Sequence, residues 1–490
     1  LKSNNKPYSA FIIYIDGMSD SNLINQFILK PLMLRNKANT YKTQSLKTIN
    51  KDKKVIIQRD SNDLAVEIEN SLLPQNSLVK ETEFNNIFAG VNSGNCALFI
   101  DTLDIAFNID VKGFKQRSVS SPNNEIIIKG PQEAFVESIR VNTSMLRRAT
   151  NTENLVIENV LVGKLSKTPC AICYLKNIAN SDLVAEVRYR LNNIEIDSLL
   201  STGQLEQLII DSNVMDIPQV LSTERPDKAS SYLLDGRVIV LVNGTPYALI
   251  APAIFTDFLG SPDDKNMKSS FSNFVKSIRI LAVFFTLLLP GIYVAVSNFH
   301  SEVLPTDLLF SILASRENVP FPVIFEILIL EISFELIREA GLRVPSPIGT
   351  TISIVGALVL GQAAVSAGIV SPVLVIIVAM TGISSFAIPD FSFSFHLRLY
   401  RFIFIFLGYC CGFLGIGLGL FAYISILCDM KSFGVPYMAG ISPFSKTKGH
   451  SYFLPPVWKR EYRAQYLDTK KDEKQEKIAM KWKFPFLHIK

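Results

Sequence analysis

The distribution of hydrophobic positions divides the chain into two unlike parts. Up to about residue 270, short apolar runs alternate with polar turns and with segments of helical periodicity, a pattern typical of α/β structure. Beyond Arg279 the apolar runs become long and carry no charge, and they cover residues 280–299, 344–389 and 402–428. Because a membrane-spanning helix needs about 20 such residues, these runs predict one, two and one crossings.

A repeated pattern of apolar and polar positions lies within the first part. The strand, turn and helix start around Tyr14 recurs around Tyr174, and the apolar hairpin that follows Gly94 recurs after Gly236. In the second hairpin an Asn-Gly pair at 243–244 predicts a type I′ turn, because both residues tolerate positive φ. We therefore predict two α/β subdomains of one ancestry.

These patterns together define the expected fold class. We predict an α+β cytoplasmic part of two related α/β subdomains, followed by an all-α polytopic membrane domain of about four to six helices. The expected boundaries are 1–150 and 151–270 for the subdomains, 271–430 for the membrane domain and 431–490 for a basic cytoplasmic tail.

Composition and charge agree with this division. The chain is 48% hydrophobic and 19% charged, which excludes a disordered chain and a secreted disulfide scaffold. Basic residues flank the first long apolar run and follow the last one, so the positive-inside rule predicts that both ends of the membrane domain face the cytoplasm. Four crossings are the simplest even number, and this count leaves Arg398 and Arg401 on the outer side.

Two cysteines, Cys170 and Cys173, have the spacing of a redox or metal motif. They lie in an apolar, β-prone stretch, and strand positions three apart point to opposite faces of a sheet. We therefore interpret them as a structural pair rather than as a metal site or a disulfide.

Carboxylates recur at a helical spacing between the first and second apolar runs. Glu331, Glu335 and Glu339 form one acidic stripe, with Glu326 about 140° away around the helix. A charge at the bilayer centre is costly, so the stripe should line water, pair with Arg338 or Arg343, or lie in the interface. Two interpretations stay open: an ion pathway or subunit contact, and a surface helix whose carboxylates are hydrated.

The run that follows is uncharged but contains weakly polar side chains. It suits a narrow pore with apolar rings, and the candidate pore-lining residues are Ser353, Leu358, Gln362, Val365 and Ser366. The alternative is ordinary packing of small residues between helices.

A polar motif precedes a predicted helix in the second subdomain. It consists of Thr223, Glu224, Arg225, Pro226 and Asp227. One interpretation is local, with Ser222 or Thr223 as the helix cap and the acids favouring the positive helix end. The other is that Arg225 and Glu224 pair across neighbouring subunits in a ring.

Sequence motifs of catalysis are missing from the chain. It contains no P-loop, dinucleotide fingerprint, HExxH or nucleophile elbow, and its four histidines are scattered. We therefore expect no enzyme activity, no cofactor and no metal. The lysine-rich tail indicates a solvated or membrane-surface segment rather than a nucleic-acid binder.

Short strings along most of the chain are shared with one family. In the first part they start at Arg117 (RSVSSP), Lys129 (KGPQEAFVES), Arg147 (RR), Ile217 (IPQ) and Thr223 (TERPD). In the second part they start at Pro290 (PGIY), Arg316 (RENVPFP), Leu336 (LIREAGLRVP), Gly361 (GQAAV) and Ser432 (SFGVPY). In number and order these strings resemble the A subunits of the GerA family of spore germinant receptors.

The resemblance implies an integral protein of the inner spore membrane, with its soluble domain in the spore core. Such A subunits work with a transporter-like B subunit, which binds the nutrient, and with a C lipoprotein. The family's receptors are understood as nutrient-gated ion channels in which A subunits form an oligomeric ring around a pore. The expected partners are thus membrane lipid, the B and C subunits and further copies of the chain.

The sequence departs from the family's pattern at both ends. Family members usually carry an extra N-terminal stretch and an acidic turn after the Pro-Tyr motif, where this chain has the basic segment 445–450. A rival function stays open as well: a secondary transporter or membrane scaffold that uses the stripe at Glu331, Glu335 and Glu339.

Overall fold

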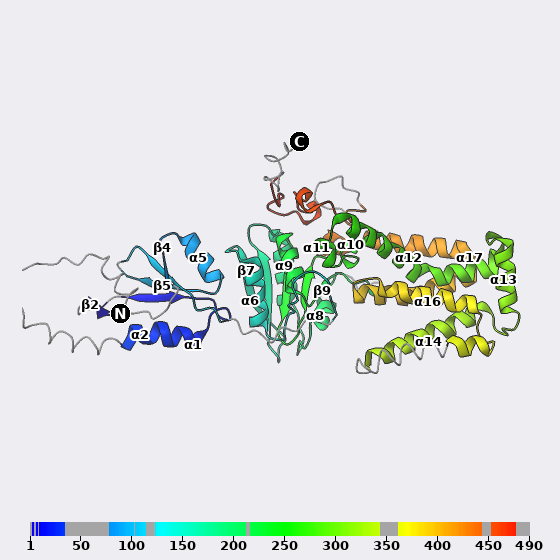
Figure 1. Ribbon diagram of the computed structural model, residues 1–490, viewed down its shortest axis with the longest axis horizontal. Helices are drawn as coiled ribbons and strands as arrows, with labels where there is room; N and C mark the ends of the chain where they lie inside the picture. The colour runs from blue at the N-terminus through cyan, green and yellow to red at the C-terminus, as the bar shows by residue number, and fades with distance from the viewer. Residues whose placement is uncertain are drawn as a thin grey trace, which may run out of the picture.

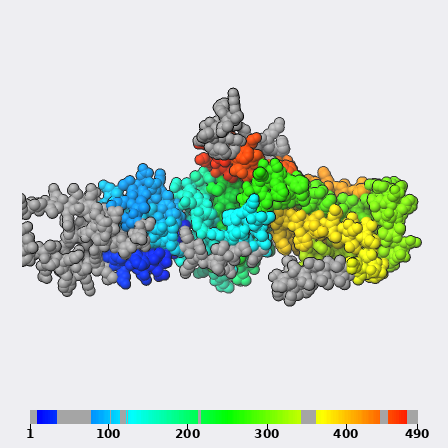
Figure 2. Space-filling model, in the orientation of Figure 1, coloured from blue at the N-terminus to red at the C-terminus, as the bar shows by residue number. Residues whose placement is uncertain are grey.

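The protein is an elongated molecule whose parts lie in a row, two β-sheets followed by a helical bundle (Figure 1). The computed structural model describes residues 2–3, 6–7, 9–34, 78–101, 103–113, 122, 124–211, 216–343, 361–442 and 452–476. Residues 452–476 fold back from the bundle onto the middle of the molecule, where they form a ridge on the surface (Figure 2).

The first sheet has the strand order β3-β5-β6-β4, and every neighbouring pair is antiparallel. Its strands are β3 (Ala10–Ile13), β4 (Leu78–Glu81), β5 (Cys96–Ile100) and β6 (Ala106–Ile109). One face packs on α1 (Ser21–Leu23), η1 (Ile24–Leu29) and α2 (Lys30–Leu34), and the other on α5 (Phe84–Asn92). A short ladder of β1 (Lys2–Ser3) and β2 (Lys6–Pro7) precedes it.

The second sheet has the order β7-β8-β10-β11-β9 and is also antiparallel. Its strands are β7 (Leu155–Val162), β8 (Thr168–Leu175), β9 (Leu221–Thr223), β10 (Val238–Val242) and β11 (Ala248–Ala251). One face packs on α6 (Ile139–Thr150) and α9 (Pro226–Leu234), and the other on α7 (Ser181–Asn192) and α8 (Thr202–Ile209). The sheet is therefore buried on both sides.

The register of the strands repeats between the two sheets. Ile13 is opposite Ala97 in the first sheet, and Cys173 is opposite Ile239 in the second, so the partners are shifted by 160 and 142 residues. The pairings β5-β6 and β4-β6 recur as β10-β11 and β9-β11 at the shift of 142. The duplication predicted from the sequence is thus present strand by strand, with β7 as an addition in the second copy.

The structure agrees with the prediction for the two cysteines and contradicts the predicted turn type. Cys170 and Cys173 lie on opposite faces of β8, in different hydrophobic clusters, as the strand period requires. The hairpin after Gly236 is present, but its predicted type I′ turn is wrong, because residues 243–247 connect the strands and only Gly244 has positive φ. Helix α6 packs on the second sheet, and we propose that the boundary between the subdomains lies ahead of it.

The helical bundle begins directly after α10 (Phe255–Phe258) and α11 (Asp263–Asn266). Its helices are α12 (Ser269–Phe299), α13 (Thr306–Arg316), α14 (Val323–Arg343), α16 (Pro372–Phe386) and α17 (Phe391–Asp429). Among the described helices, α12 and α17 are long and apolar enough to cross a membrane, and α16 is a shorter apolar helix. The first part of the run at 344–389 lies outside the described residues.

Helix α17 is a helical hairpin. Gly412 interrupts it with φ 60° and ψ −143°, and the side chains before and after this glycine meet. His396 Nε2 lies 2.9 Å from the Tyr423 hydroxyl, whereas 27 residues of straight helix would span about 40 Å. The prediction that residues 402–428 make a single pass is therefore wrong, because glycine's access to positive φ lets the chain turn back inside the run.

The outside of the bundle is apolar. Large side chains with more than half of their surface exposed include Phe274 on α12, Ile383 on α16, and Leu414 and Phe421 on α17. Isolated apolar side chains are common on soluble proteins, but an apolar surface shared by several helices indicates contact with lipid or protein.

Helices α12 and α17 approach each other closely at two glycines. A Cβ atom on Gly291 would lie 2.6 Å from the Phe404 carbonyl oxygen, and one on Gly408 would lie 2.5 Å from the Gly291 carbonyl oxygen. Small residues of this kind allow membrane helices to pack backbone to backbone. Gly291 belongs to the Pro290-Gly-Ile-Tyr string noted in the sequence.

We predict that Gly408→Ala destabilises the bundle by about 1–3 kcal/mol, because the added methyl group forces the two backbones apart. Gly417→Ala is the matched control on the same helix, since a Cβ atom there meets nothing within 4 Å. Thermal unfolding of the detergent-solubilised protein checks the prediction, and equal midpoints for the two variants would contradict it.

The buried cysteines give a second prediction. Burial raises the pKa of Cys96, Cys170 and Cys173 to about 12, so roughly one thiol in ten thousand is ionised at pH 8. In a variant with Cys410, Cys411 and Cys428 replaced by alanine, these three thiols should stay unreactive toward a chromogenic disulfide until the protein is unfolded. Rapid reaction of the native protein would show that the strands open.

Candidate functional site

A cluster of five charged side chains lies inside the helical bundle. Glu331, Glu335 and Arg338 come from successive turns of α14, and Arg398 and Arg401 come from one face of the first segment of α17. Helix α14 starts after Pro320 and Pro322, residues that favour a helix start and not a helix interior. The i, i+4 and i, i+3 spacings place each set on one side of its helix.

The distances show that the two sets pair with each other. Arg398 Nη1 donates to Glu335 Oε2 at 2.7 Å, and Arg401 Nη2 donates to Glu335 Oε1 at 3.0 Å. Arg401 Nη2 also lies 2.8 Å from Glu331 Oε2. Arg338 Nη1 is 3.7 Å from Glu335 Oε1, and its Nη2 donates to Ser385 Oγ at 2.9 Å. Glu335 is thus the centre of the cluster.

Because charges in the cluster are buried, losing this pairing would cost stability. Glu331 and Arg401 are both 0% exposed, and a buried charge without a partner is strongly unfavourable. Aromatic rings cover two of the guanidinium groups: Arg338 lies 4.5 Å from the ring centroid of Phe386, and Arg398 lies 5.1 Å from that of Phe395. The cluster is therefore an ionic contact between α14 and α17 that is fully buried at Glu331 and Arg401 and partly exposed at Glu335.

The cluster contains three guanidinium groups and two carboxylates, and its hydrogen bonding is incomplete. Neither oxygen of Glu331 has a hydrogen-bond donor among the described residues, although one lies close to Arg401. The Nε and Nη1 groups of Arg401 also have no acceptor there. Buried polar groups in native proteins are normally satisfied, so these side chains are held mainly by the attraction of their charges rather than by a complete set of hydrogen bonds.

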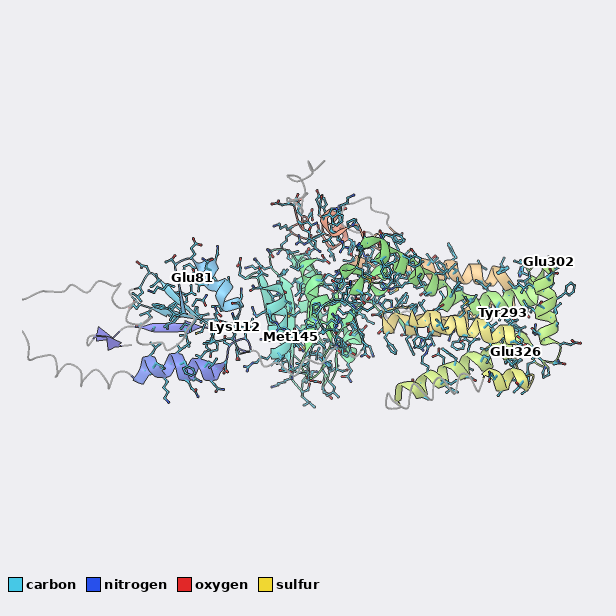
Figure 3. The ribbon with its side chains drawn as sticks, viewed as in Figure 1. Glu81, Lys112, Met145, Tyr293, Glu302 and Glu326 are labelled. Carbon is cyan, nitrogen blue, oxygen red and sulfur yellow. The ribbon has the colours of Figure 1, made fainter. Side chains whose placement is uncertain are left out.

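Glu326 forms a separate contact at the far end of the bundle, near Tyr293 and the tip at Glu302 (Figure 3). Its Oε1 lies 3.3 Å from Arg316 Nη2, and its Oε2 accepts from the Ser371 backbone N–H at 3.0 Å. This contact joins the end of α13 to the starts of α14 and α16. Glu326 therefore has other partners than Glu331 and Glu335.

The remaining stripe residues lie elsewhere. Glu339 is exposed, and the side chain of Arg343 lies outside the described residues. Arg398 and Arg401 face the interior of the bundle, where they pair with α14, and their location on the outer side of the membrane stays a prediction. Their i, i+3 spacing in an otherwise apolar stretch was the available signal for an internal partner.

The candidate pore-lining residues are only partly described. Ser353 and Leu358 lie outside the described residues, while residues 361–366 are helical. Gln362 and Ser366 are exposed, and Val365 packs against the cluster of apolar residues between α14 and α16. The polar pair thus faces away from the chain's own core.

The polar motif of the second subdomain is folded inward. Glu224 Oε1 accepts from the backbone N–H groups of Asn124 and Glu125 at 2.6 and 2.8 Å. Thr223 Oγ1 donates to the Glu125 carboxylate. The first half of the motif therefore holds residues 124–125 against the edge of the sheet at β9.

Arg225 is fully buried and has its partners within the chain. It binds Asp227 through Nη2 at 2.9 Å and donates to the carbonyl oxygens of Pro131 and Glu125 at 2.7 and 3.1 Å. It is also the N-cap residue of α9, with Pro226 at the first helical position, so the expectation of a Ser222 or Thr223 cap is wrong. Pairing of Arg225 with a neighbouring subunit would require it to leave these contacts.

Comparison with known proteins identifies the family of the chain. Residues 1–466 match the family described as Bacillus/Clostridium GerA spore germination protein. The chain belongs to the GerA family of spore germination proteins, which confirms the resemblance found in the sequence.

Named relatives align over most of their length. The chain is 39% identical to spore germination protein KA of Bacillus subtilis (strain 168), over 95% of this chain and 82% of the relative. It is 38% identical to spore germination protein B1 of the same organism, over 88% and 85%. It is also 38% identical to spore germination protein GerLA of Bacillus cereus, over 80% of each chain.

One solved structure is also similar in sequence. It is the N-terminal domain of the A subunit of the Bacillus megaterium spore germinant receptor GerK3, at 32% identity, with a TM-score of 0.37. The match covers 52% of this chain and 85% of that domain. Among the residues described here, no group of three or more His, Cys, Asp or Glu side chains could hold a metal ion.

The ionic cluster gives a prediction for stability. Arg401→Met should destabilise the protein by roughly 3–5 kcal/mol, because it leaves the carboxylate of Glu331 buried without its paired cation. Adding Glu331→Gln to that variant should recover part of the loss, since the unpaired charge is then removed. Thermal unfolding in detergent measures both effects, with the exposed Glu302→Gln as the control. A double variant no more stable than the single one would exclude this ion pair as the cause.

Proposed function

We propose that the protein is the A subunit of a nutrient-responsive spore germinant receptor, a non-enzymatic membrane protein whose copies assemble around an ion-conducting pore. Membership of the GerA family supports the receptor role. One observation carries the pore: Gln362 and Ser366 are exposed polar side chains on a bundle whose outer surface is otherwise largely apolar. Such a face is favourable in a membrane when several copies bring it together around water.

The proposed location is the inner membrane of the spore, with the two sheets on the spore-core side. Basic residues support this orientation, because Lys276 and Arg279 on α12 and Lys431 after α17 all lie at the end of the bundle next to the sheets. Positive charge is enriched on the cytoplasmic side of membrane proteins. The apolar exposed side chains of α12, α16 and α17 would then contact lipid.

The proposed partners follow from the family. A transporter-like B subunit would bind the nutrient, and a C lipoprotein would complete the receptor. A ligand shifts a conformational equilibrium only by its difference in affinity between the states. The B subunit must therefore bind nutrient more tightly when the assembly of A subunits is open.

A second candidate function is a secondary transporter formed by this chain alone. The unsatisfied carboxylate of Glu331 favours it, because a buried acid of this kind can couple a proton or ion to transport. In that case the cluster around Glu335 would be a moving part, whereas in a receptor channel it would be a fixed contact between α14 and α17.

Reconstitution in liposomes separates the two candidates. For the receptor channel we expect flux of monovalent ions when nutrient is added, and only with the B and C subunits present. Stoichiometric ion-coupled uptake by this chain alone would support the transporter and contradict the channel.

Thiol labelling tests the pore face directly, in a background that lacks Cys410, Cys411 and Cys428. Gln362→Cys and Ser366→Cys should react with a charged thiosulfonate and lose most of the nutrient-dependent flux. Val365→Cys is the matched control and should keep its flux, because Val365 packs against the apolar cluster between α14 and α16. Equal behaviour of the three variants would remove this face from the pore.

A further inference from the structure

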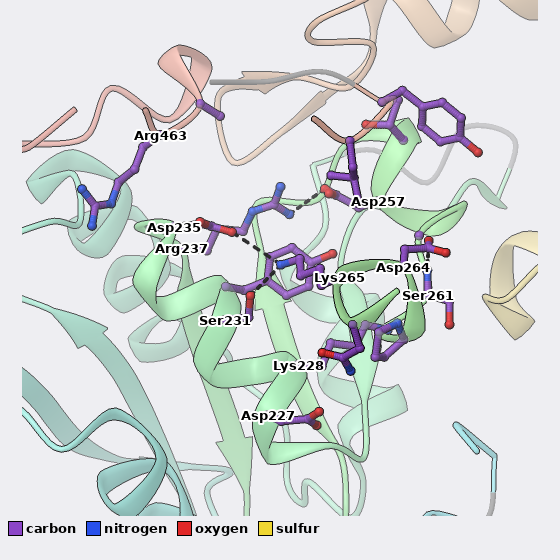
Figure 4. Close-up of a pocket in the computed structure, with 18 of the residues that line it drawn as sticks. Asp227, Lys228, Ser231, Asp235, Arg237, Asp257, Ser261, Asp264, Lys265 and Arg463 are labelled. Atoms are coloured by element: carbon purple, nitrogen blue, oxygen red, sulfur yellow. Dashed lines mark hydrogen bonds and ion pairs between the residues drawn. The ribbon is translucent and has the colours of Figure 1, made fainter. Parts of the chain in front are cut away.

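A cavity of about 460 Å³ lies where the second sheet, the start of α12 and the C-terminal segment meet (Figure 4). Helix α9 forms one side, residues 256–266 form another, and residues 452–467 close it from outside. A volume of this size suits a small organic molecule rather than a single ion or water. The cavity is separate from the ionic cluster of the bundle.

Charged side chains of both signs line the cavity, but the acids are already paired. Asp264 is bound by Arg279 at 2.6 Å, and Asp257 by Arg237 at 2.6 Å. Asp227 and Asp235 are bound by Arg225 and Lys474. Of these four cations only Arg237 lines the cavity. The other three neutralise their acids without adding positive charge to the cavity wall.

Two of the lining cations, Lys228 and Arg237, are bound by Glu125 and Asp257, whereas the other three are bound mainly by neutral oxygen atoms. Arg463 donates to the carbonyl oxygens of Leu234, Lys471 and Glu473. Lys265 Nζ donates to Ser231 Oγ at 2.6 Å and lies 3.8 Å from the nearest oxygen of Asp235. The cavity therefore presents a surplus of positive charge.

Lys276 is the strongest indication of a missing anion. Its side chain is buried, its Nζ donates to the Tyr452 carbonyl oxygen at 2.8 Å, and it lies over the Tyr452 ring. No carboxylate lies within 4 Å of this ammonium group among the described residues. A buried ammonium group with one neutral acceptor is unfavourable unless an anion completes it.

Arg237, which lines the same cavity, is a second indication of a missing anion, independent of Lys276. Its Nη1 binds Asp257, and its Nη2 donates to the Tyr466 hydroxyl at 3.1 Å. The Nε–H group is buried and has no acceptor among the described residues. An oxyanion in the cavity would satisfy an N–H donor of this kind, because Arg groups recognise phosphate and carboxylate oxygens through such donors.

We propose that this cavity binds a small phosphate ester. The phosphate group would be held by Lys276, Lys265, Arg463 and the Nε–H of Arg237, since several cations around one site suit the charge of a phosphate. Tyr462 and Tyr466 line the same space and would lie against the remainder of the molecule. The ester could be a soluble metabolite or the headgroup of an anionic phospholipid, because the cavity lies beside the start of α12.

Such a ligand would join three parts of the chain. Lys276 belongs to α12, Arg237 precedes β10, and Tyr466 and Arg463 belong to the C-terminal segment. Occupancy would therefore stabilise the contact between the head, the base of the bundle and the returning segment. This inference does not depend on the proposed pore.

Binding to the full-length chain in phospholipid nanodiscs tests the proposal. In phosphatidylcholine discs, glycerol 3-phosphate should bind saturably by calorimetry if the ligand is a soluble ester. If the ligand is a headgroup, discs with phosphatidylglycerol should raise the unfolding temperature and prevent that binding. Absence of both effects in the folded protein would overturn the proposal.

Variants locate the site. Lys276→Met should weaken binding, or reduce the stabilisation by phosphatidylglycerol, at least tenfold in apparent affinity. Lys268→Met is the matched control, because Lys268 is exposed, lies just before α12 and is not part of the lining. Lys265→Gln, at a half-exposed lysine, provides a second test if Lys276→Met unfolds. Unchanged binding in a folded variant of either residue would exclude this cavity.

Discussion

The buried guanidinium group of Arg401 fixes the arrangement of the helical bundle. It lies in an apolar interior, where it is stable only because Glu331 and Glu335 reach it from α14. The pairing determines which faces of α14 and α17 meet and how far one helix is shifted along the other. Apolar packing alone tolerates other registers, whereas a displaced ion pair leaves charges buried without partners.

A second constraint, close backbone packing, acts along the same helices. Gly291 and Gly408 let α12 and α17 touch, and Gly412 turns α17 back on itself beside His300. Both ends of α17 consequently lie next to the sheets, where Phe393 stacks on Phe258 at 5.8 Å between ring centroids. The bundle is thus attached to the head at the base of α12 and at both ends of the hairpin.

Much of this structure could be predicted from the sequence, where local patterns decide the outcome. The repeat was visible at Tyr14 and Tyr174, because the spacing of apolar residues indicates where the strands lie and in which order the hairpins follow. The opposite faces of Cys170 and Cys173 follow from the strand period alone. The acidic stripe was visible as a spacing, but the sequence left open whether it lies inside the bundle or on the membrane surface. Glu331 and Glu335 pair inside the bundle, whereas Glu339 is exposed.

The larger misses share one physical reason: they depend on contacts between distant segments. A glycine inside an uncharged run is typical of helix packing, and the turn at Gly412 is seen only from its backbone angles and from the meeting of His396 with Tyr423. The partners of Arg225 lie about a hundred residues earlier in the chain, at Glu125 and Pro131. The cavity has no sequence signature, since its walls come from α9, α12 and residues 452–467.

The end of α17 shows how the head and the bundle can influence each other. Ser432, three residues after α17, donates through Oγ to the Gln219 carbonyl oxygen at 2.7 Å and accepts from the Ala253 backbone N–H at 3.1 Å. In the next residue, Phe433, the ring centroid lies 4.2 Å from the guanidinium carbon of Arg190 on α7. These buried contacts tie the hairpin to both faces of the second sheet. A shift of the hairpin against Glu335 must therefore also strain the head, because rigid, packed elements transmit displacement rather than absorb it.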